Sequence, residues 1–308
     1  MTSALQTLYG TTVQAEEIDH LGHMNVRFYA AKALRASRVL ADQVGLSMQR
    51  CADEGAVLEL RTAFTRHYRE QMKGAELVMK GGVLEVHADG MRLYHELLNP
   101  AREERAATFV HDMRLRDEAS RAPRPLPEMA AVEAARRRVD WPEHGRPRTV
   151  DLGREPRALS REEALERGIA MRQVRELRPD ECTDGGYFPA IRYAELVWGG
   201  VPVDARLGWE PLRKLPDGGK MGWAILESRG VLRRLPRAGD RVQSFGVEVE
   251  IGRKTSYRHS WVFDVDQGDL LLTTSTVDIA FDITRRRAIE IPRATRESLE
   301  ARCQPDLL

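Results

Sequence analysis

The sequence predicts an α+β protein in which one long helix packs on an antiparallel sheet, and in which this arrangement occurs twice. The first observation is the order of patterns near the N-terminus, where a short strand pattern at 11–15 precedes a long helix pattern at 25–41. Strand patterns then follow at 56–65, 76–86, 92–98 and 106–115. One helix followed by several strands fits this architecture. The second observation is that the second half repeats the order in outline, which indicates an internal duplication.

The long helix is predicted from the spacing of its apolar residues. Phe28, Ala31, Leu34 and Leu40 recur at intervals typical of one helix face, and Gly45 is a typical helix stop. Farther along, the pair of glycines at 81–82 suggests a bulge or kink inside the 76–86 strand.

The composition of the chain changes near residue 120. A basic, proline-rich stretch at 121–127 precedes a helix pattern at 128–139, and Ser160 opens a short helix with the form of a capping box. We therefore expect an N-terminal domain at 1–119, a linker with surface helices at 120–168 and a C-terminal domain at 169–308.

The second half begins with a strand pattern at 174–178, followed by a glycine-containing segment at 180–189 and a helix pattern at 190–198. Further strand patterns lie at 223–232, 241–250, 255–265 and 270–283. Phe245, Val247 and Val249 alternate with polar residues, which is typical of a half-buried strand. The arginines at 285–287 are expected to close a final strand rather than bind nucleic acid.

Composition places the chain among ordinary globular proteins. Its 308 residues suggest two domains, and the net charge of +1 gives no reason to expect nucleic-acid binding. The 3 cysteines lack metal-type spacing and are expected to be free thiols in a reducing compartment. No secretory signal or membrane-spanning apolar run is visible, so we expect a cytoplasmic protein without membrane association.

The residues best suited to catalysis lie between the first strand and the long helix. Asp19, Gly22, His23 and Asn25 fall within seven consecutive positions there. The first N–H groups of a helix have no partner inside it, and the helix dipole places partial positive charge at that end. A carboxylate beside them can act as base or nucleophile, while the N–H groups hold a developing oxyanion.

Simpler interpretations exist for several of these residues. Asp19 and Asn25 are both common helix N-cap residues, and Asn25 as a pure cap stays open beside a catalytic role. His20 and His23 form a short pair without a third ligand nearby in sequence, so we expect no metal site.

The pattern Asp-x-x-Gly-His-Met-Asn-x-x-x-Tyr at 19–29 resembles the signature of hotdog-fold acyl-CoA thioesterases of the 4-hydroxybenzoyl-CoA thioesterase type. The run at 58–74 is similar to the second-strand region of betainyl-CoA thioesterases. The resemblance covers about the first third of the chain and implies two hotdog domains in tandem. It also implies an acyl-CoA or acyl-carrier-protein thioester as substrate, no cofactor, and pairing of two chains as a homodimer.

The resemblance implies roles for individual residues. Asp19 is expected as nucleophile or general base, with backbone N–H groups near Gly22, His23 and Met24 as the oxyanion site. His23 is expected to hold the thioester or tune Asp19, and Asn25 to orient water or cap the helix.

Further substrate-binding candidates are Gly22, Met24 and Tyr29 of the motif, together with Glu59 and His67 from the following strand. Glu59 faces either the site or solvent in an alternating strand. His67 either lines the groove or packs at an edge, and packing is the simpler interpretation.

The second copy departs from the motif. Gly186 is followed by Tyr187, Phe188 and Pro189, and Asp184 aligns with His20 rather than with Asp19. We therefore expect one working site per chain, in the N-terminal copy. A hotdog hydratase or dehydratase acting on enoyl-CoA is one alternative, and a non-catalytic acyl-CoA-binding protein is the other. A nucleophile elbow and a phosphate-binding loop are both missing from the sequence.

Overall fold

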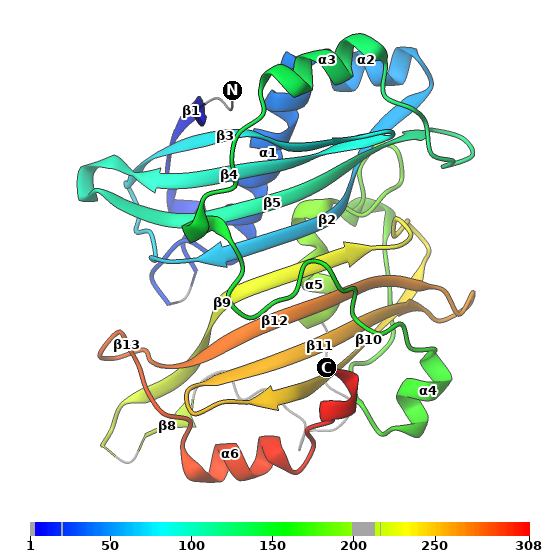
Figure 1. Ribbon diagram of the computed structural model, residues 1–308. Coiled ribbons are helices and arrows are strands. Elements are labelled where there is room, and N and C mark those ends of the chain that lie inside the picture. The colour runs from blue at the N-terminus through cyan, green and yellow to red at the C-terminus, as the bar shows by residue number, and fades with distance from the viewer. Residues whose placement is uncertain (1–3, 20, 199–212, 216) are drawn as a thin grey trace. The chain divides into compact units, whose positions relative to one another are not determined.

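The chain divides into two compact units, Met1–Arg148 and Thr149–Leu308. The computed structural model describes residues 4–19, 21–198, 213–215 and 217–308 (Figure 1). The division falls inside the segment at 120–168 that the sequence suggests as a linker. Among the helices of the described residues, none combines the length and apolar character needed to cross a membrane.

The first unit is built on an antiparallel sheet of five strands. The strands are β1 (Gln6–Thr12), β2 (Ala56–His67), β3 (Glu76–His87), β4 (Gly90–Asn99) and β5 (Glu104–Asp117), and their order in the sheet is β1-β3-β4-β5-β2. Every neighbouring pair in this series is antiparallel. The helices are α1 (Val26–Gln43), α2 (Met48–Asp53) and α3 (Glu128–Arg136), with short 3-10 turns η1 (Ala15–Glu17), η2 (Pro100–Arg102) and η3 (Glu143–Gly145).

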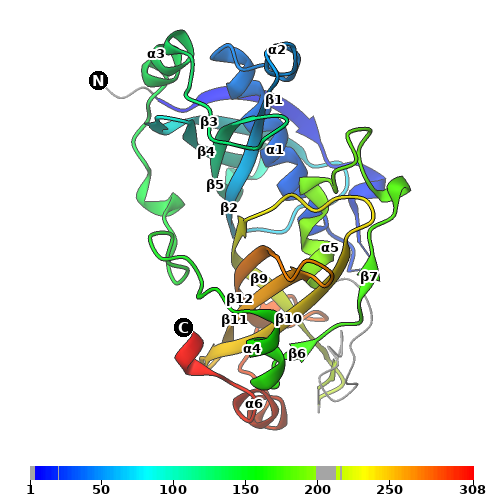
Figure 2. The same cartoon turned by 90° about the vertical axis from the view of Figure 1, so that its right-hand side faces the viewer.

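Helix α1 packs against the sheet along its apolar face (Figures 1 and 2). Ala33 and Ala36 are fully buried in one cluster with Met79, Leu97 and Phe109 from three strands. The small alanines allow the helix to approach the strands closely, and the long side chains fill the layer between them. This is the α+β arrangement that the helical spacing predicts.

Helix α3 packs into the same unit rather than only covering a linker. Its Ala130 and Ala134 are buried in one cluster with Leu40 of α1. Beyond α3, Val139 lies so close to Gly82 that a side chain at Gly82 would meet a Val139 methyl carbon at 2.5 Å. Gly82 thus leaves room for Val139. The bulge predicted at the glycine pair 81–82 is wrong, because the register shift in the pairing of β3 with β4 lies between Val83 and Glu85.

The second unit repeats the strand order of the first. Its main strands are β9 (Lys220–Leu232), β10 (Arg241–Ile251), β11 (Thr255–Asp264) and β12 (Leu270–Asp282), and the order is β9-β12-β11-β10-β6, with β6 at Ala170–Met171. In each unit the five strands of this series can be counted in chain order, which in the second unit is β6, β9, β10, β11 and β12. In both units the first strand then pairs with the third, and the second strand pairs with the fifth. The predicted internal duplication and α+β class are confirmed.

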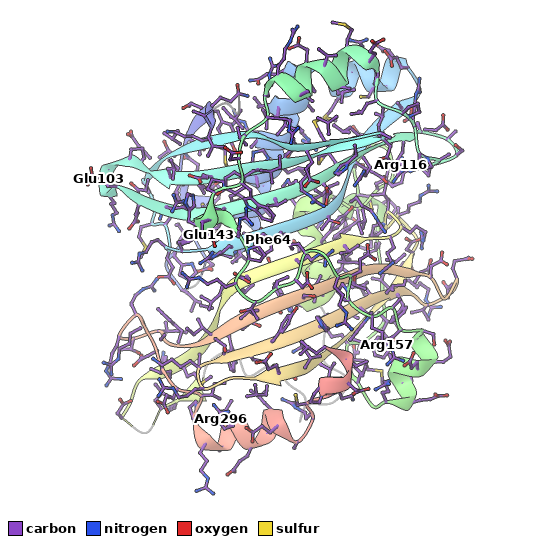
Figure 3. All side chains as sticks on the ribbon, in the orientation of Figure 1. Phe64, Glu103, Arg116, Glu143, Arg157 and Arg296 are labelled. Atoms are coloured by element: carbon purple, nitrogen blue, oxygen red, sulfur yellow. The ribbon has the colours of Figure 1, made fainter. Side chains whose placement is uncertain are left out.

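Shorter elements complete the second unit. They are β7 (Arg175–Glu176), β8 (Arg213–Lys214), β13 (Arg287–Ala288), α4 (Arg161–Glu166), α5 (Tyr193–Trp198), α6 (Arg293–Glu300), η4 (Pro179–Glu181), η5 (Ala190–Arg192) and η7 (Pro305–Leu307). Figure 3 shows Arg157 ahead of α4, where its carbonyl oxygen accepts a 2.8 Å hydrogen bond from Trp261 Nε1. This bond ties the segment at 149–160 to the sheet of its own unit.

Several predicted boundaries differ from the structure. The first strand ends at Thr12 instead of spanning 11–15, because Gln14 caps η1 and Ala15 already belongs to that turn. The strand expected at 174–178 is reduced to β7, and the helix expected at 190–198 begins as the 3-10 turn η5. The helix expected at 128–139 ends at Arg136.

Candidate active site

The candidate site is a tight loop between η1 and α1. The loop is closed by hydrogen bonds from Asn25 N to Glu17 O at 2.9 Å and from Asp19 N to His23 O at 2.9 Å. Gly22 N donates to Asp19 O at 3.0 Å, and Gly22 has a φ of +84°. Because only glycine adopts this φ without strain, the turn that brings His23 back toward Asp19 depends on Gly22.

Asp19 and His23 face each other across this turn. Asp19 Oδ2 lies 3.6 Å from His23 Nδ1, and the two side chains are 13% and 15% exposed. Asp19 Oδ1 accepts a 2.8 Å hydrogen bond from Leu21 N. The backbone thus fixes one carboxylate oxygen and leaves the other directed at the imidazole.

Glu70 completes the group from the other side of His23. His23 Nε2 lies 3.3 Å from Glu70 Oε1, and His23 Nδ1 lies 3.3 Å from Met24 O. Both ring nitrogens therefore face oxygen acceptors, so a protonated imidazole can donate at both ends. The sequence gives no local signal for Glu70, which lies 47 residues beyond His23.

The loop that carries Glu70 is held by a buried amide network. Gln71 is 1% exposed, and its side chain accepts a 2.8 Å bond from Asn99 Nδ2 and donates to Glu104 Oε1 at 3.2 Å. Its carbonyl oxygen accepts a 2.8 Å bond from Met24 N. Gln71 therefore joins the loop after β2 to the loop before α1, and sets the distance between Glu70 and His23.

Fewer backbone N–H groups can serve as oxyanion donors in this loop than the sequence suggests. The N–H groups of Gly22 and Met24 already donate to Asp19 O and Gln71 O, so the expectation does not hold for these two amides. His23 N–H is different, since the described part of the chain supplies no acceptor for it.

Asn25 is the N-cap of α1. Its φ of −64° and ψ of 143° are those of a cap residue, and its side-chain oxygen accepts from Arg27 N at 3.0 Å. Phe28 N also donates to Asn25 O at 2.9 Å. Capping is therefore present, and the first helical amide, Val26 N–H, is another group without an acceptor among the described residues.

Met24, Tyr29 and His67 lie on the buried side of the loop. Met24 is 1% and Tyr29 is 3% exposed, and the Tyr29 ring meets His67 edge to face at a centroid distance of 5.0 Å. Tyr29 Oη donates to Arg69 O at 3.2 Å. Burial lowers the pKa of His67 to about 4, so this imidazole is neutral near pH 7. Met24 and Tyr29 thus pack in the core of the unit, and His67 packs against Tyr29.

Glu59 is not brought into this group. It lies eight residues before His67 on β2, which corresponds to about 26 Å along a strand. Its carboxylate pairs with Arg121 and lies 3.5 Å from Arg116 Nε, at the end of β5 labelled in Figure 3. Both contacts indicate a structural ion-pair network for Glu59.

The second copy keeps the loop and changes its side chains. Thr183 N donates to Tyr187 O at 2.9 Å, and Gly186 N donates to Thr183 O at 2.8 Å. Gly186 has a φ of +75°, and Phe188 is 1% exposed, as Met24 is in the first copy. Thr183 therefore takes the place of Asp19, and Tyr187 that of His23. The predicted alignment of Asp184 with His20 stays a prediction, because His20 lies outside the described residues.

Comparison with known proteins finds a family match within the first copy. Residues 13–135 match the family model described as the thioesterase-like superfamily. No curated protein sequence matches the chain.

Solved structures match nearly the whole chain. A 12:0-ACP thioesterase from Umbellularia californica is 12% identical, with a TM-score of 0.67 over 90% of this chain and 94% of that one. An acyl-ACP thioesterase from Bacteroides thetaiotaomicron is 11% identical, with a TM-score of 0.65 over 89% of this chain and 97% of that one. A protein from Lactobacillus plantarum described as a putative oleoyl thioesterase is 9% identical, with a TM-score of 0.65 over 90% and 96%. The chain therefore has the double hotdog fold.

Proposed function

We propose that this protein hydrolyses an acyl thioester to a free acid and a thiol at the loop before α1. The observation that carries the proposal is the group Asp19, His23 and Glu70, in which His23 lies 3.6 Å from one carboxylate and 3.3 Å from the other. The match of residues 13–135 to the thioesterase-like superfamily supports the same reaction class.

In the base route, Asp19 Oδ2 takes a proton from water as the water oxygen attacks the thioester carbonyl carbon. The carbonyl oxygen becomes an oxyanion, and its proposed donors are the N–H groups of His23 and Val26 near the start of α1, which have no acceptor among the described residues. Collapse of the tetrahedral adduct breaks the C–S bond. The departing sulfur takes a proton from His23, which Glu70 keeps oriented.

In the nucleophile route, Asp19 Oδ2 attacks the carbonyl carbon itself, the thiolate leaves, and water then hydrolyses the mixed anhydride. A single turnover in ¹⁸O-labelled water tests direct attack, since label in the Asp19 carboxylate arises when water attacks the Asp19 carbonyl of the anhydride. Label in the product acid alone arises in the base route and also when water attacks the acyl carbon of the anhydride. Borohydride trapping of an acyl adduct on Asp19 then separates these two cases.

The acyl carrier is proposed as coenzyme A or acyl-carrier protein. Two of the structures with the same fold are described as ACP thioesterases. The resemblance of residues 58–74 to betainyl-CoA thioesterases favours small or polar acyl groups on coenzyme A. A homodimer in the cytoplasm, working without a cofactor or metal, remains part of the proposal.

The decisive experiment measures free-thiol release from short, long, aromatic and cationic acyl-CoAs, and from the matching acyl-carrier proteins. Asp19→Asn should lower kcat by at least about 100-fold, because the carboxylate is lost while the side-chain shape is kept. Thr183→Asn is the matched control at the same loop position of the second copy. Equal activity of wild type and Asp19→Asn would move the reaction away from this loop.

The two alternatives give different results in the same preparation. A hydratase changes the absorbance of an enoyl-CoA without releasing thiol. An acyl-CoA-binding protein is stabilised by the ligand without turnover.

A further inference from the structure

The segment just before the candidate loop is tied to α1 by a buried ion pair. Lys32 Nζ lies 2.7 Å from Glu17 Oε1, and the two side chains are 8% and 11% exposed. Glu17 ends η1 two residues before Asp19, and Lys32 lies in the second turn of α1. The pair therefore links the start of the loop to the helix that follows it.

Glu17 also closes the loop through its other polar atoms. Its carbonyl oxygen accepts from Asn25 N at 2.9 Å, and its Oε2 accepts from Gln14 N at 3.2 Å. On the helix side, Tyr9 Oη donates to Lys32 O at 2.5 Å. The base of the loop is thus held to η1, to α1 and to β1 around one buried carboxylate.

A buried ion pair of this kind is a weak source of stability. The free energy lost when both charges leave water offsets most of their attraction, so a neutral pair of similar volume is often equally stable. We expect the ion pair to favour a single geometry, because a rearrangement that separates the two groups leaves each buried charge without its partner.

The second copy keeps an equivalent anchor. Glu181 ends η4 two residues before Thr183, and its Oε2 accepts from Arg178 N at 3.2 Å, as Glu17 accepts from Gln14 N. Its Oε1 accepts from Arg175 at 3.1 Å and from Arg192 at 3.4 Å. Since Thr183 and Tyr187 replace the reactive side chains there, the glutamate holds the loop independently of any chemistry on it.

We infer that Glu17 and Lys32 are positioning residues that hold Asp19 and His23 at the spacing used in the reaction. The kinetic part of this inference rests on the proposed function. Among the described residues, no hydrogen bond or ion pair joins Glu17 or Lys32 to the side chains of Asp19 and His23, so we expect the pair to act through the backbone at the two ends of the loop. Its loss is therefore expected to lower kcat while leaving KM nearly unchanged.

The kinetic experiment uses the double variant Glu17→Gln/Lys32→Met, which removes both charges and keeps an acceptor for Gln14 N. We expect a Tm within about 4 °C of wild type. We expect kcat to fall by about 10- to 100-fold, the size of effect that a misplaced catalytic group produces. Lys32→Arg preserves the charge and should restore most of kcat. Arg50→Met, which breaks the exposed Arg50–Glu54 pair of α2, is the matched control and should leave kcat unchanged.

A second measurement does not depend on turnover. Hydrogen exchange of the Gly22 and Met24 amides should quicken by about 10-fold or more in the double variant, since local opening becomes easier. The Val44 and Leu46 amides at the far end of α1 should be unchanged. If the double variant does not fold, Glu17→Asp, which keeps both charges and shortens the reach of the carboxylate to Lys32, serves for both measurements.

The outcomes separate the two proposals. Wild-type protein that releases no thiol contradicts the proposed function, and the exchange data then decide the positioning role alone. Unchanged exchange at Gly22 and Met24 overturns the inference, as does an unchanged kcat in a folded variant of an active enzyme.

Discussion

His23 Nε2 lies 3.3 Å from Glu70 Oε1, which joins two loops that are far apart in sequence. The Glu70 loop follows β2 and is fixed by the buried side chain of Gln71, while the His23 loop is fixed by the turn at Gly22. The imidazole is therefore oriented by groups on both sides, with Asp19 on the remaining side. An arrangement in which one side chain orients the group that transfers a proton is common in acid–base catalysis.

Glu70→Gln should lower kcat for thioester hydrolysis by about 100-fold, because the carboxylate that faces His23 Nε2 and orients the ring is replaced by a neutral amide. KM should change little, since Glu70 is directed at His23. Steady-state kinetics with the best substrate test this expectation. Glu76→Gln, an exposed carboxylate at the start of β3, is the control. A Glu70→Gln enzyme as active as wild type would mean that the contact serves only to pack the loop.

Substitutions in the second loop should leave turnover unchanged. Thr183 stands where Asp19 does, and it lacks a carboxylate. Thr183→Ala and Asp184→Asn change exposed side chains, so we expect kcat within about twofold of wild type. Loss of activity in either variant, with the Tm unchanged, would show that the C-terminal copy takes part in the reaction.

Much of the fold follows from the sequence because helix and strand periodicities are local. The spacing of Phe28, Ala31 and Leu34 predicts α1, and the strands at 241–250 and 255–265 are found nearly at those bounds. The sequence pattern predicts the first strand too far along the chain, because Gln14 caps η1 and the strand ends at Thr12. The turn capped by Gln14 thus ends the strand, although the strand pattern in the sequence continues to Ala15.

The site was predictable only in part, for a related reason. Asp19, Gly22 and His23 are close in sequence, so their meeting is set by one turn. Glu70 reaches His23 only through the pairing of β2 with β5 and the anchoring of Gln71 by Asn99, which no local pattern encodes. Glu59 has a suggestive position in sequence, yet the register of β2 places it far from His67.

Asn25→Ala should destabilise the protein by about 1 kcal/mol, because Arg27 N loses the side-chain oxygen that caps α1. Urea unfolding measures the change, and Ser47→Ala at the cap of α2 is the matched control. Asn25→Ser keeps the cap and separates the two interpretations of this residue. Full stability with full activity supports a pure cap, whereas full stability with lost activity supports a catalytic role.

The core between α1 and the sheet contains a polar layer that should make stability depend on pH. Ser37 Oγ lies 2.9 Å from His95 Nε2 and 2.8 Å from His111 Nδ1, and all three residues are buried. Burial lowers the pKa of His111 to about 4 and holds that of His95 well below its usual range. The two imidazoles are therefore neutral in the folded protein near pH 6.

In the unfolded chain both imidazoles titrate near pH 6.5, so the unfolded state binds more protons below that pH. The stability is complete above about pH 6.5 and falls as the pH drops toward 4, by about 2 kcal/mol per histidine at pH 5. The pKa of Asp278 is raised by burial to about 7, and that group has the opposite sign. A comparison with a variant is therefore needed to isolate the histidines.

His111→Gln removes one of the two titrating groups and keeps a side chain able to hydrogen-bond to Ser37. The free energy of unfolding in urea, measured at pH 7 and pH 5, should drop by about 2 kcal/mol less in the variant than in wild type. An equal pH dependence in wild type and His111→Gln would show that His111 binds the same number of protons in the folded and unfolded states, which contradicts the prediction.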